Sequence, residues 1–182
     1  MITLHRNNIL NLLNDYDKRY PSESAVTTRL LTFINNNTDC FKRELKEGHI
    51  TGSCWLINQA GDSILLTHHK KLHLWLQLGG HVDGESDVAN AALREAQEES
   101  GLNTLTLSSP EIFDIDIHPI PENKKDQAHY HYDIRFIIRS HGNEDYIVSD
   151  ESHDLAWVNL NQLEEYTQEV SILRMAKKWS AS

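Results

Sequence analysis

The sequence predicts an α/β layer fold that carries a helical extension at its N-terminus. Two amphipathic segments occupy residues 1–45, and strand-like segments dominate after residue 46. Helical periodicity returns at 87–100 and again at 161–179. Because strands interleaved with helices are typical of sheets covered by helices, we expect a helical extension over 1–45 and a main domain over 46–182.

The extension has the pattern of two short helices. Apolar residues recur at helical spacing before and after a break at Pro21, and Ser22 stands where it can cap the second helix. Each helix has one apolar stripe and must bury it on another surface. We therefore expect the pair to dock on the main domain, where it either covers the cleft or forms the face of a homodimer.

The main domain begins with a predicted hairpin, whose strands at 49–58 and 63–69 flank a turn-forming Gln-Ala-Gly-Asp segment. An extended segment then ends in paired glycines, and a helix follows. Further strands are predicted at 104–108, 111–118, 128–139 and 155–160, with polar loops at 119–127 and 141–154. Side chains of these two loops are expected to set substrate specificity.

Composition excludes several classes of partner. The formal net charge of −10 argues against a nucleic acid polymer or a membrane surface, which require clustered Lys and Arg. We find no signal peptide and no apolar run of the length that a membrane span needs. The two cysteines have neither CxxC spacing nor a disulfide pattern. A cytoplasmic location is therefore expected.

The segment after the paired glycines concentrates acidic residues on one helix face. At helical spacing, alanines form a narrow face for packing, while Glu95, Glu98 and Glu99 lie together elsewhere, flanked by Arg94. Gly101 follows at the position of a C-cap glycine. Hard divalent cations such as Mg²⁺ prefer such carboxylates together with phosphate oxygens. The alternative interpretation is a solvated acidic face.

The spacing of these residues resembles the Nudix box, Gly-x5-Glu-x7-Arg-Glu-U-x-Glu-Glu-x-Gly-U, in which U is aliphatic. Gly80 begins the matching segment and Leu102 ends it, and the preceding Trp75 and Gly79 are similar to the lead-in of the family. The one departure is Ser86, which stands where the box has its first glutamate. Glu85 and Asp87 are the neighbouring acids that can replace this glutamate as a partner of Arg94.

The resemblance implies an α/β/α sandwich with a mixed sheet and a reaction that hydrolyses a nucleoside diphosphate linked to another group X. It implies that Glu98 and Glu99 bind Mg²⁺ or Mn²⁺, with Glu95 and the Gly79 carbonyl as further ligands. It also implies that Arg94 orients the glutamates, and that Gly80 and Gly101 are structural. The identities of X, of the nucleobase and of the general base stay open.

Residues outside the box extend the predicted site. Strand alternation places His129, His131, Asp133 and Arg135 on one face of the strand at 128–139. His131 or Asp133 can contact phosphate or metal there, unless this face is simply solvated.

Three further positions are candidates. His81 follows the paired glycines and can contact substrate, and Lys70 can meet substrate phosphates. Many relatives place one more acid outside the box as a metal ligand or general base, and Glu151 is our candidate for it. The alternative is that His81 merely caps the loop and that Lys70 and Glu151 are solvated loop residues.

Two other functions fit parts of the sequence. Ser86 favours a module that senses a nucleotide without cleaving it. A branch of the same superfamily isomerises isoprenoid diphosphates, but that chemistry needs an active-site Cys next to a His, and neither Cys40 nor Cys54 has such a setting. Hydrolysis of a nucleoside diphosphate derivative is the function we expect.

Overall fold

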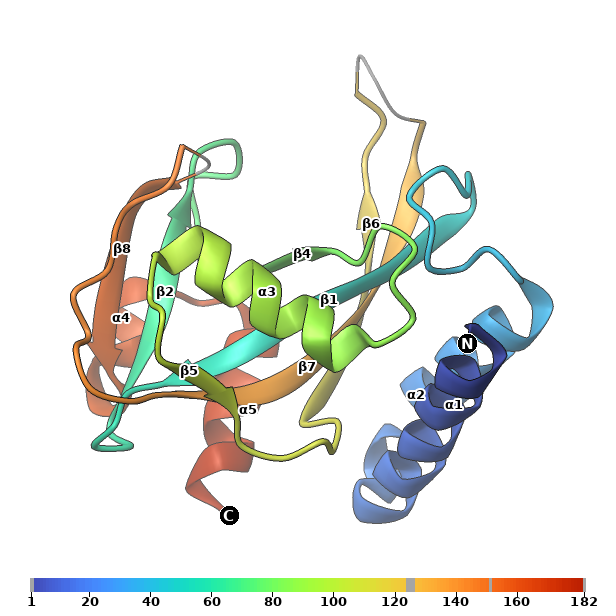
Figure 1. Cartoon of the computed structure of the whole chain (residues 1–182), viewed down its shortest axis with the longest axis horizontal. Helices are drawn as coiled ribbons and strands as arrows, with labels where there is room; N and C mark the ends of the chain where they lie inside the picture. Colours follow the sequence, from blue (N-terminus) through green and yellow to red (C-terminus); the bar gives the residue numbers. More distant parts are fainter. Residues whose placement is uncertain (1, 124–126, 151, 182) are drawn as a thin grey trace.

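A mixed sheet forms the centre of the protein, as seen in a computed structural model that describes residues 2–123, 127–150 and 152–181 (Figure 1). Within these residues the sheet has eight strands. They are β1 (Gly48–Ile57), β2 (Ser63–His69), β3 (Trp75–Gln77), β4 (Gly79–His81), β5 (Leu105–Leu107), β6 (Asp114–Ile120), β7 (His129–Ser140) and β8 (Ser152–Asn159).

The main path through the sheet runs β3-β2-β1-β7-β5, with β4 paired to β1, β6 to β7 and β8 to β2. Only β1 and β7 pair in parallel among the strands described; the other pairs are antiparallel. The parallel register places His49 beside His131. Two histidines far apart in the sequence therefore become neighbours.

Helices cover both faces of this sheet. Cys54 and Leu56 of β1 pack in one buried cluster with Ala96 of α3 (Val88–Ser100). The alternate residues of β1 pack on the opposite face with α5 (Val170–Ser180). Because β1 is buried on both faces, its sequence is almost continuously apolar in its second half. The predicted α/β/α sandwich with a mixed sheet is confirmed.

Two predicted helix boundaries are wrong. Ser22 does not cap the second helix, because Pro21 starts a 3-10 turn (Pro21–Glu23) that contains Ser22 and leads into α2 (Ser24–Asn36). The predicted C-terminal helix is also interrupted. A 3-10 turn (Leu160–Gln162) and a short α4 (Leu163–Tyr166) precede α5, and Thr167 between them is extended and accepts a bond from the Glu169 amide.

The N-terminal helices dock on the main domain. Residues of α1 (Ile2–Arg19) and α2 share one buried cluster with β1, α3, β6 and β7. The rings of Phe33 and Tyr132 stack with their centroids 3.8 Å apart. The predicted division near residue 45 falls between the end of α2 and the start of β1.

A buried ionic network also joins the extension to the sheet and to α5. Lys178 donates to Tyr16 Oη at 2.6 Å and to Asp114 Oδ1 at 2.7 Å. Arg135 and Arg174 donate to the other oxygen of Asp114, at 3.2 and 2.7 Å. The fully buried Asp114 thus pairs with three cations, of which Arg135 is buried, Lys178 nearly so and Arg174 partly exposed. No described helix combines the length and the apolar character that crossing a lipid bilayer requires.

Replacing Asp114 with alanine should lower the free energy of unfolding by about 3–5 kcal/mol, because the buried cations would lose their shared partner. Urea denaturation at neutral pH measures this change. Asp15→Ala is the control, since Asp15 pairs only with the exposed Lys18 at the surface. An equal shift of the midpoint in both variants would contradict a special role for Asp114.

Candidate active site

The paired glycines allow β4 to lie close against both β1 and α3. Gly79 has a φ of 150°, and a Cβ atom there would lie 2.5 Å from the Ser53 Cα of β1. A Cβ atom on Gly80 would lie 2.3 Å from Glu95 Oε2. Any side chain at these positions would displace β1 or the carboxylate, so only glycine permits this approach.

Two box glutamates converge on these glycines. The Gly79 amide donates to Glu99 Oε2 at 2.8 Å, and the Glu95 carboxylate lies against Gly80. Glu98 lies one turn away with 62% of its side chain exposed. The helix that carries them begins after Asp87, which caps the Asn90 amide, and ends at Gly101 in the left-handed conformation. The structure therefore brings Glu95, Glu99 and the Gly79 backbone together.

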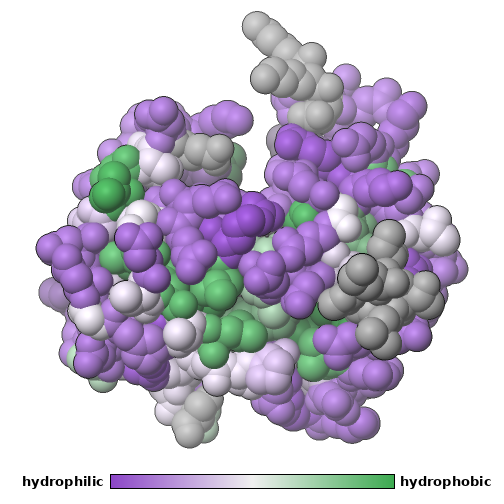
Figure 2. Space-filling model, viewed as in Figure 1, coloured by the Kyte–Doolittle hydropathy of each residue, from purple (hydrophilic) through white to green (hydrophobic). Residues whose placement is uncertain are grey.

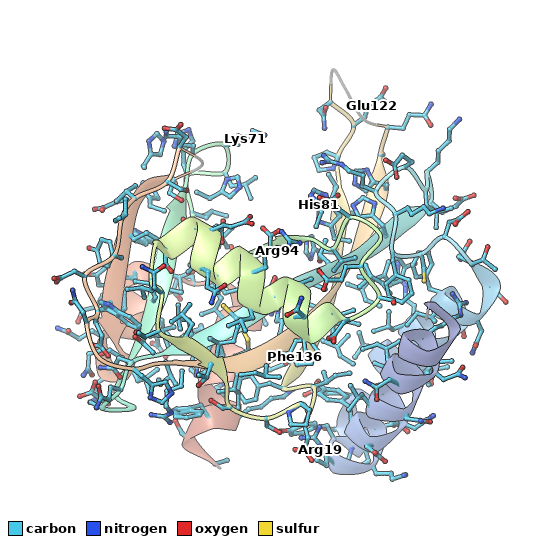
Figure 3. All side chains as sticks on the ribbon, viewed as in Figure 1. Arg19, Lys71, His81, Arg94, Glu122 and Phe136 are labelled. Carbon is cyan, nitrogen blue, oxygen red and sulfur yellow. The ribbon has the colours of Figure 1, made fainter. Side chains whose placement is uncertain are left out.

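Arg94 links this acidic cluster to β4 (Figure 3). Its guanidinium lies 2.6 Å from Glu95 Oε1 and 3.5 Å from Glu98 Oε2, and it donates to the His81 carbonyl at 3.3 Å. Burial nevertheless raises the pKa of the Glu95 carboxyl, because Arg94 only partly offsets the loss of hydration. The cluster thus has room for additional positive charge.

Ser86 stands where the box has its first glutamate, and its two acidic neighbours, Glu85 and Asp87, make different contacts. Ser86 itself is buried. Glu85 lies 3.9 Å from Arg94 Nε and accepts a bond from the Asn90 side chain at 2.6 Å, whereas Asp87 caps the helix. Of the two acids that we considered as substitutes, Glu85 is the one that reaches Arg94.

A pocket of about 370 Å³ lies next to this cluster, and His81 belongs to its wall. The molecular surface is hollowed between the β2–β8 end of the sheet and the β6–β7 hairpin, and hydrophilic side chains surround the hollow (Figure 2). Three cationic side chains, Arg43, Lys46 and Lys71, line the pocket and, among the described residues, outnumber its one lining acid, Glu44. An anionic ligand is therefore favoured there.

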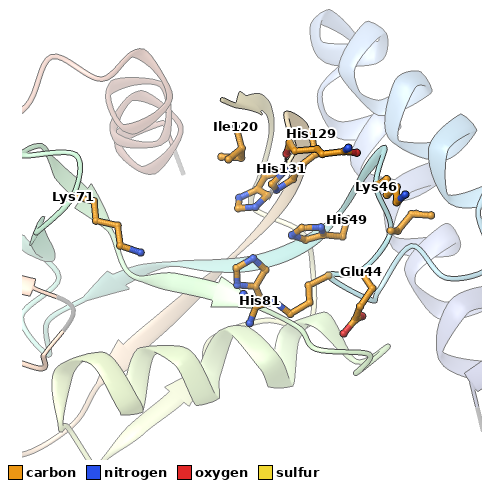
Figure 4. A pocket seen from close by; sticks show the side chains of 11 residues that line it. Glu44, Lys46, His49, Lys71, His81, Ile120, His129 and His131 are labelled. Carbon is orange, nitrogen blue, oxygen red and sulfur yellow. Dashed lines mark hydrogen bonds between the residues drawn. The ribbon is translucent and has the colours of Figure 1, made fainter. Parts of the chain in front are cut away.

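Four imidazoles form one wall of the pocket, with Lys71 reaching in from the opposite side (Figure 4). The ring centroids of His81 and His131 lie 4.9 and 4.8 Å from that of His49. Burial, reinforced by the neighbouring imidazoles, lowers the pKa of His49 to about 4 and that of His131 to about 2. Both rings are therefore neutral at pH 7.

The structure separates the residues predicted outside the box. His81 and His131 line the pocket, but Lys70 donates to the Asp150 carbonyl at 2.7 Å and its neighbour Lys71 lines the pocket instead. Asp133 does not reach the pocket surface: it is 2% exposed and accepts bonds from Thr51 and Ser53. Glu151 lies outside the described residues.

Sequence reasoning missed two groups of pocket residues. His49 is isolated in the sequence, and only the parallel pairing of β1 with β7 reveals its place beside His131. Arg43 and Lys46 belong to the segment that joins α2 to β1, which has no motif. A histidine in a predicted strand whose other residues, up to Ile57, are apolar, small or hydroxyl-bearing was the signal that could have indicated His49.

Neither cysteine offers a nucleophile to the pocket. Cys40 and Cys54 are both buried, and burial raises the pKa of each thiol. Neither is among the side chains that line the pocket. This geometry does not favour the isomerase alternative.

A mixed sheet with helices on both faces, and with glutamates of α3 converging on Gly79 and Gly80 of β4, defines a Nudix-type hydrolase domain. The NUDIX domain model matches residues 49–178, and the chain therefore belongs to the Nudix family. As its fold relatives are Nudix hydrolases, its class is that of the pyrophosphohydrolases.

Similar solved structures have the same fold. A NUDIX-family hydrolase from Clostridium perfringens is 27% identical, with a TM-score of 0.55, over 73% of this chain and 97% of that one. A C. elegans Ap4A hydrolase is 20% identical, with a TM-score of 0.58, over 72% of this chain and 95% of that one. The MutT protein from Methanosarcina mazei Go1 is 18% identical, with a TM-score of 0.55, over 75% of this chain and 96% of that one. The comparison with curated proteins gave no match.

Glu85→Ala should lower kcat by about 10-fold, because Glu85 supports Arg94 beside the carboxylates expected to bind metal, and outer-shell partners of metal ligands typically contribute 10–100-fold. Asp87→Ala should leave kcat unchanged and lower the free energy of unfolding by about 1 kcal/mol, the cost of losing a helix cap. Steady-state hydrolysis and urea denaturation measure the two effects. A loss of kcat confined to Asp87→Ala would contradict the assignment of Glu85.

Proposed function

We propose that the protein uses Mg²⁺ or Mn²⁺ to hydrolyse the diphosphate linkage of a nucleoside diphosphate joined to another group X. The observation that carries this proposal is the convergence of Glu95 and Glu99 on Gly79 and Gly80 beside a basic pocket. Oxygen donors for a metal and cations for phosphates thus lie on either side of β4.

The residues present suit a hard divalent cation. Glu95, Glu98, Glu99 and the Gly79 carbonyl offer only oxygen donors, which Mg²⁺ and Mn²⁺ prefer. Arg94 neutralises Glu95 incompletely, as the raised pKa of that carboxyl indicates. A bound cation would supply charge neutralisation for the phosphates and a more acidic water.

The pocket supplies the contacts for the rest of the substrate. Arg43, Lys46 and Lys71 can pair with phosphate oxygens, and His81 stands between the carboxylates and the pocket. Names of fold relatives, an Ap4A hydrolase and a MutT protein, support a nucleotide as the bound class. The segments that join β6 to β7 and β7 to β8 would select the nucleobase and X. A cytoplasmic location and a homodimer built on the N-terminal helices stay predictions from the sequence.

Arg94 has a positioning role in this proposal. Because it contacts Glu95 and Glu98 and also the His81 carbonyl, it holds α3 and β4 in one arrangement. Glu85 approaches the same guanidinium from the loop before α3. The carboxylates are thereby fixed before substrate arrives, which reduces the reorganisation required during reaction.

Glu98→Gln should lower turnover by more than about 100-fold while the fold stays intact, because a metal ligand matters more than its outer-shell partners. Substrates for the assay come from a panel of nucleotide sugars, dinucleotides, nucleoside triphosphates and small diphosphates, tested with and without Mg²⁺. Glu164→Gln makes the same charge change at an exposed position of α4 and should be neutral. Parental turnover by Glu98→Gln would refute the metal-site assignment, and metal-independent binding without turnover would favour the sensor.

Lys71→Ala should raise KM by about 10-fold. A hydrogen bond between a cation and a phosphate contributes roughly 1.5 kcal/mol to binding, and about 1.4 kcal/mol corresponds to a tenfold change in affinity. Lys70→Ala is the matched control, since Lys70 donates to the Asp150 carbonyl and does not line the pocket. Steady-state kinetics on the best substrate of the panel measures both. The opposite ranking would restore the prediction made for Lys70.

A further inference from the structure

His49 lacks the partners that a buried histidine normally has. It is 3% exposed, and neither Nδ1 nor Nε2 has a hydrogen-bond partner. Buried polar groups are almost always satisfied, because an unmade bond carries the full cost of lost hydration. An orphaned imidazole at the wall of a pocket therefore indicates a ligand that the described residues do not provide.

Two further imidazoles converge on the same point. One ligand nitrogen each from His49, His129 and His131 lies within 4.8 Å of the others. The parallel pairing of β1 with β7 places His49 beside His131, and strand alternation returns His129 to the same face. Figure 4 shows these rings directed toward one another.

A hydrogen bond to a residue outside the cluster orients the His129 ring, as is common for a metal ligand. Its Nδ1 lies 2.7 Å from the Gln127 carbonyl, so that Nδ1 carries the proton and donates it. Its Nε2 is then left with a lone pair. Metal-binding histidines are commonly oriented by such a bond from the other ring nitrogen to a carbonyl.

We infer that His49, His129 and His131 bind one borderline transition-metal ion of the zinc class, at a site separate from the box carboxylates. Neutral imidazole nitrogens suit Zn²⁺ and its neighbours, whereas carboxylate oxygens suit Mg²⁺. Three protein ligands leave one tetrahedral position, and it faces the pocket, where water or a phosphate oxygen can occupy it.

Metal binding requires a small closing movement of the rings. Tetrahedral coordination at about 2.0–2.1 Å sets the ligand nitrogens roughly 3.3 Å apart, and the present separation is at most 4.8 Å. His129 and His131 are only half-buried and border an open pocket, so their side chains have room to turn. The buried His49 then acts as the fixed ligand.

Isothermal titration of the metal-free full-length protein with Zn²⁺, in excess Mg²⁺ to occupy the carboxylates, tests the inference. One Zn²⁺ should bind per chain, and His129→Gln and His131→Gln should weaken binding by more than about 100-fold. Co²⁺ should give a visible absorption band that both variants lose and that inorganic pyrophosphate shifts. Circular dichroism confirms that the variants are folded, and both substituted side chains are only partly buried.

Two controls separate this site from its neighbours. His153→Gln alters a second group of imidazoles near His68 and His73, and it should leave Zn²⁺ binding unchanged. Glu98→Gln should also leave Zn²⁺ binding unchanged. The zinc site is therefore tested independently of the proposed hydrolysis. Undiminished Zn²⁺ binding by His129→Gln and His131→Gln, or no binding by the parent, would overturn the inference. An unshifted Co²⁺ band would overturn the open fourth position.

Discussion

The close packing of β4 between β1 and α3 is the constraint on which the rest of the site depends. A side chain on Gly79 would collide with the β1 backbone, and one on Gly80 would collide with the Glu95 carboxylate. Because neither glycine has a side chain, the short strand β4 can contact the acidic helix α3 on one side. Its last residue, His81, lies at the pocket wall. The separation between the carboxylates and the pocket is therefore set by close contacts of the β4 backbone with β1 and with the Glu95 carboxylate.

The polar row of β7 shows how burial changes the role of similar residues. His129 and His131 lie at the open end of the strand and line the pocket, whereas Asp133 and Arg135 lie in the interior. Arg135 donates to Asp133 at 2.7 Å, and Asp133 in turn accepts from side chains of β1. This pair fixes the parallel strands that carry the histidines. The buried Asp133 and Arg135 therefore help to position the pocket histidines but do not line the pocket themselves.

Local patterns explain how much of this arrangement the sequence could predict. The helix that carries Glu95, Glu98 and Glu99 was predictable, because helical periodicity and the spacing of the box are properties of adjacent residues. Strand alternation also placed His129 and His131 on one face. It could not show where along the strand that face becomes buried, because α5 approaches it through contacts distant in sequence, such as those of Arg174 and Lys178 with Asp114 beside Arg135.

Residues outside motifs were not predictable for the same reason. Lys71 and Lys70 are adjacent and chemically identical, but Lys70 donates to the Asp150 carbonyl and Lys71 lines the pocket. Glu85 and Asp87 were equivalent substitutes in the sequence, and the helix cap assigns Asp87 to the backbone and leaves Glu85 for Arg94. In both pairs a hydrogen bond to the backbone removes one candidate.

The distribution of charge accounts for how an acidic protein can bind an anionic substrate. The chain carries a formal net charge of −10, yet the pocket gathers Arg43, Lys46 and Lys71 near its imidazoles, with Glu44 as its one lining acid in the part of the chain that the structure describes. The carboxylates lie across β4, where a divalent cation can neutralise them. A diphosphate positioned between these regions would meet positive charge from the protein on one side and from the metal on the other. Under the proposed function, the excess of acid at the site would hold the cation, and repulsion of the substrate would be avoided.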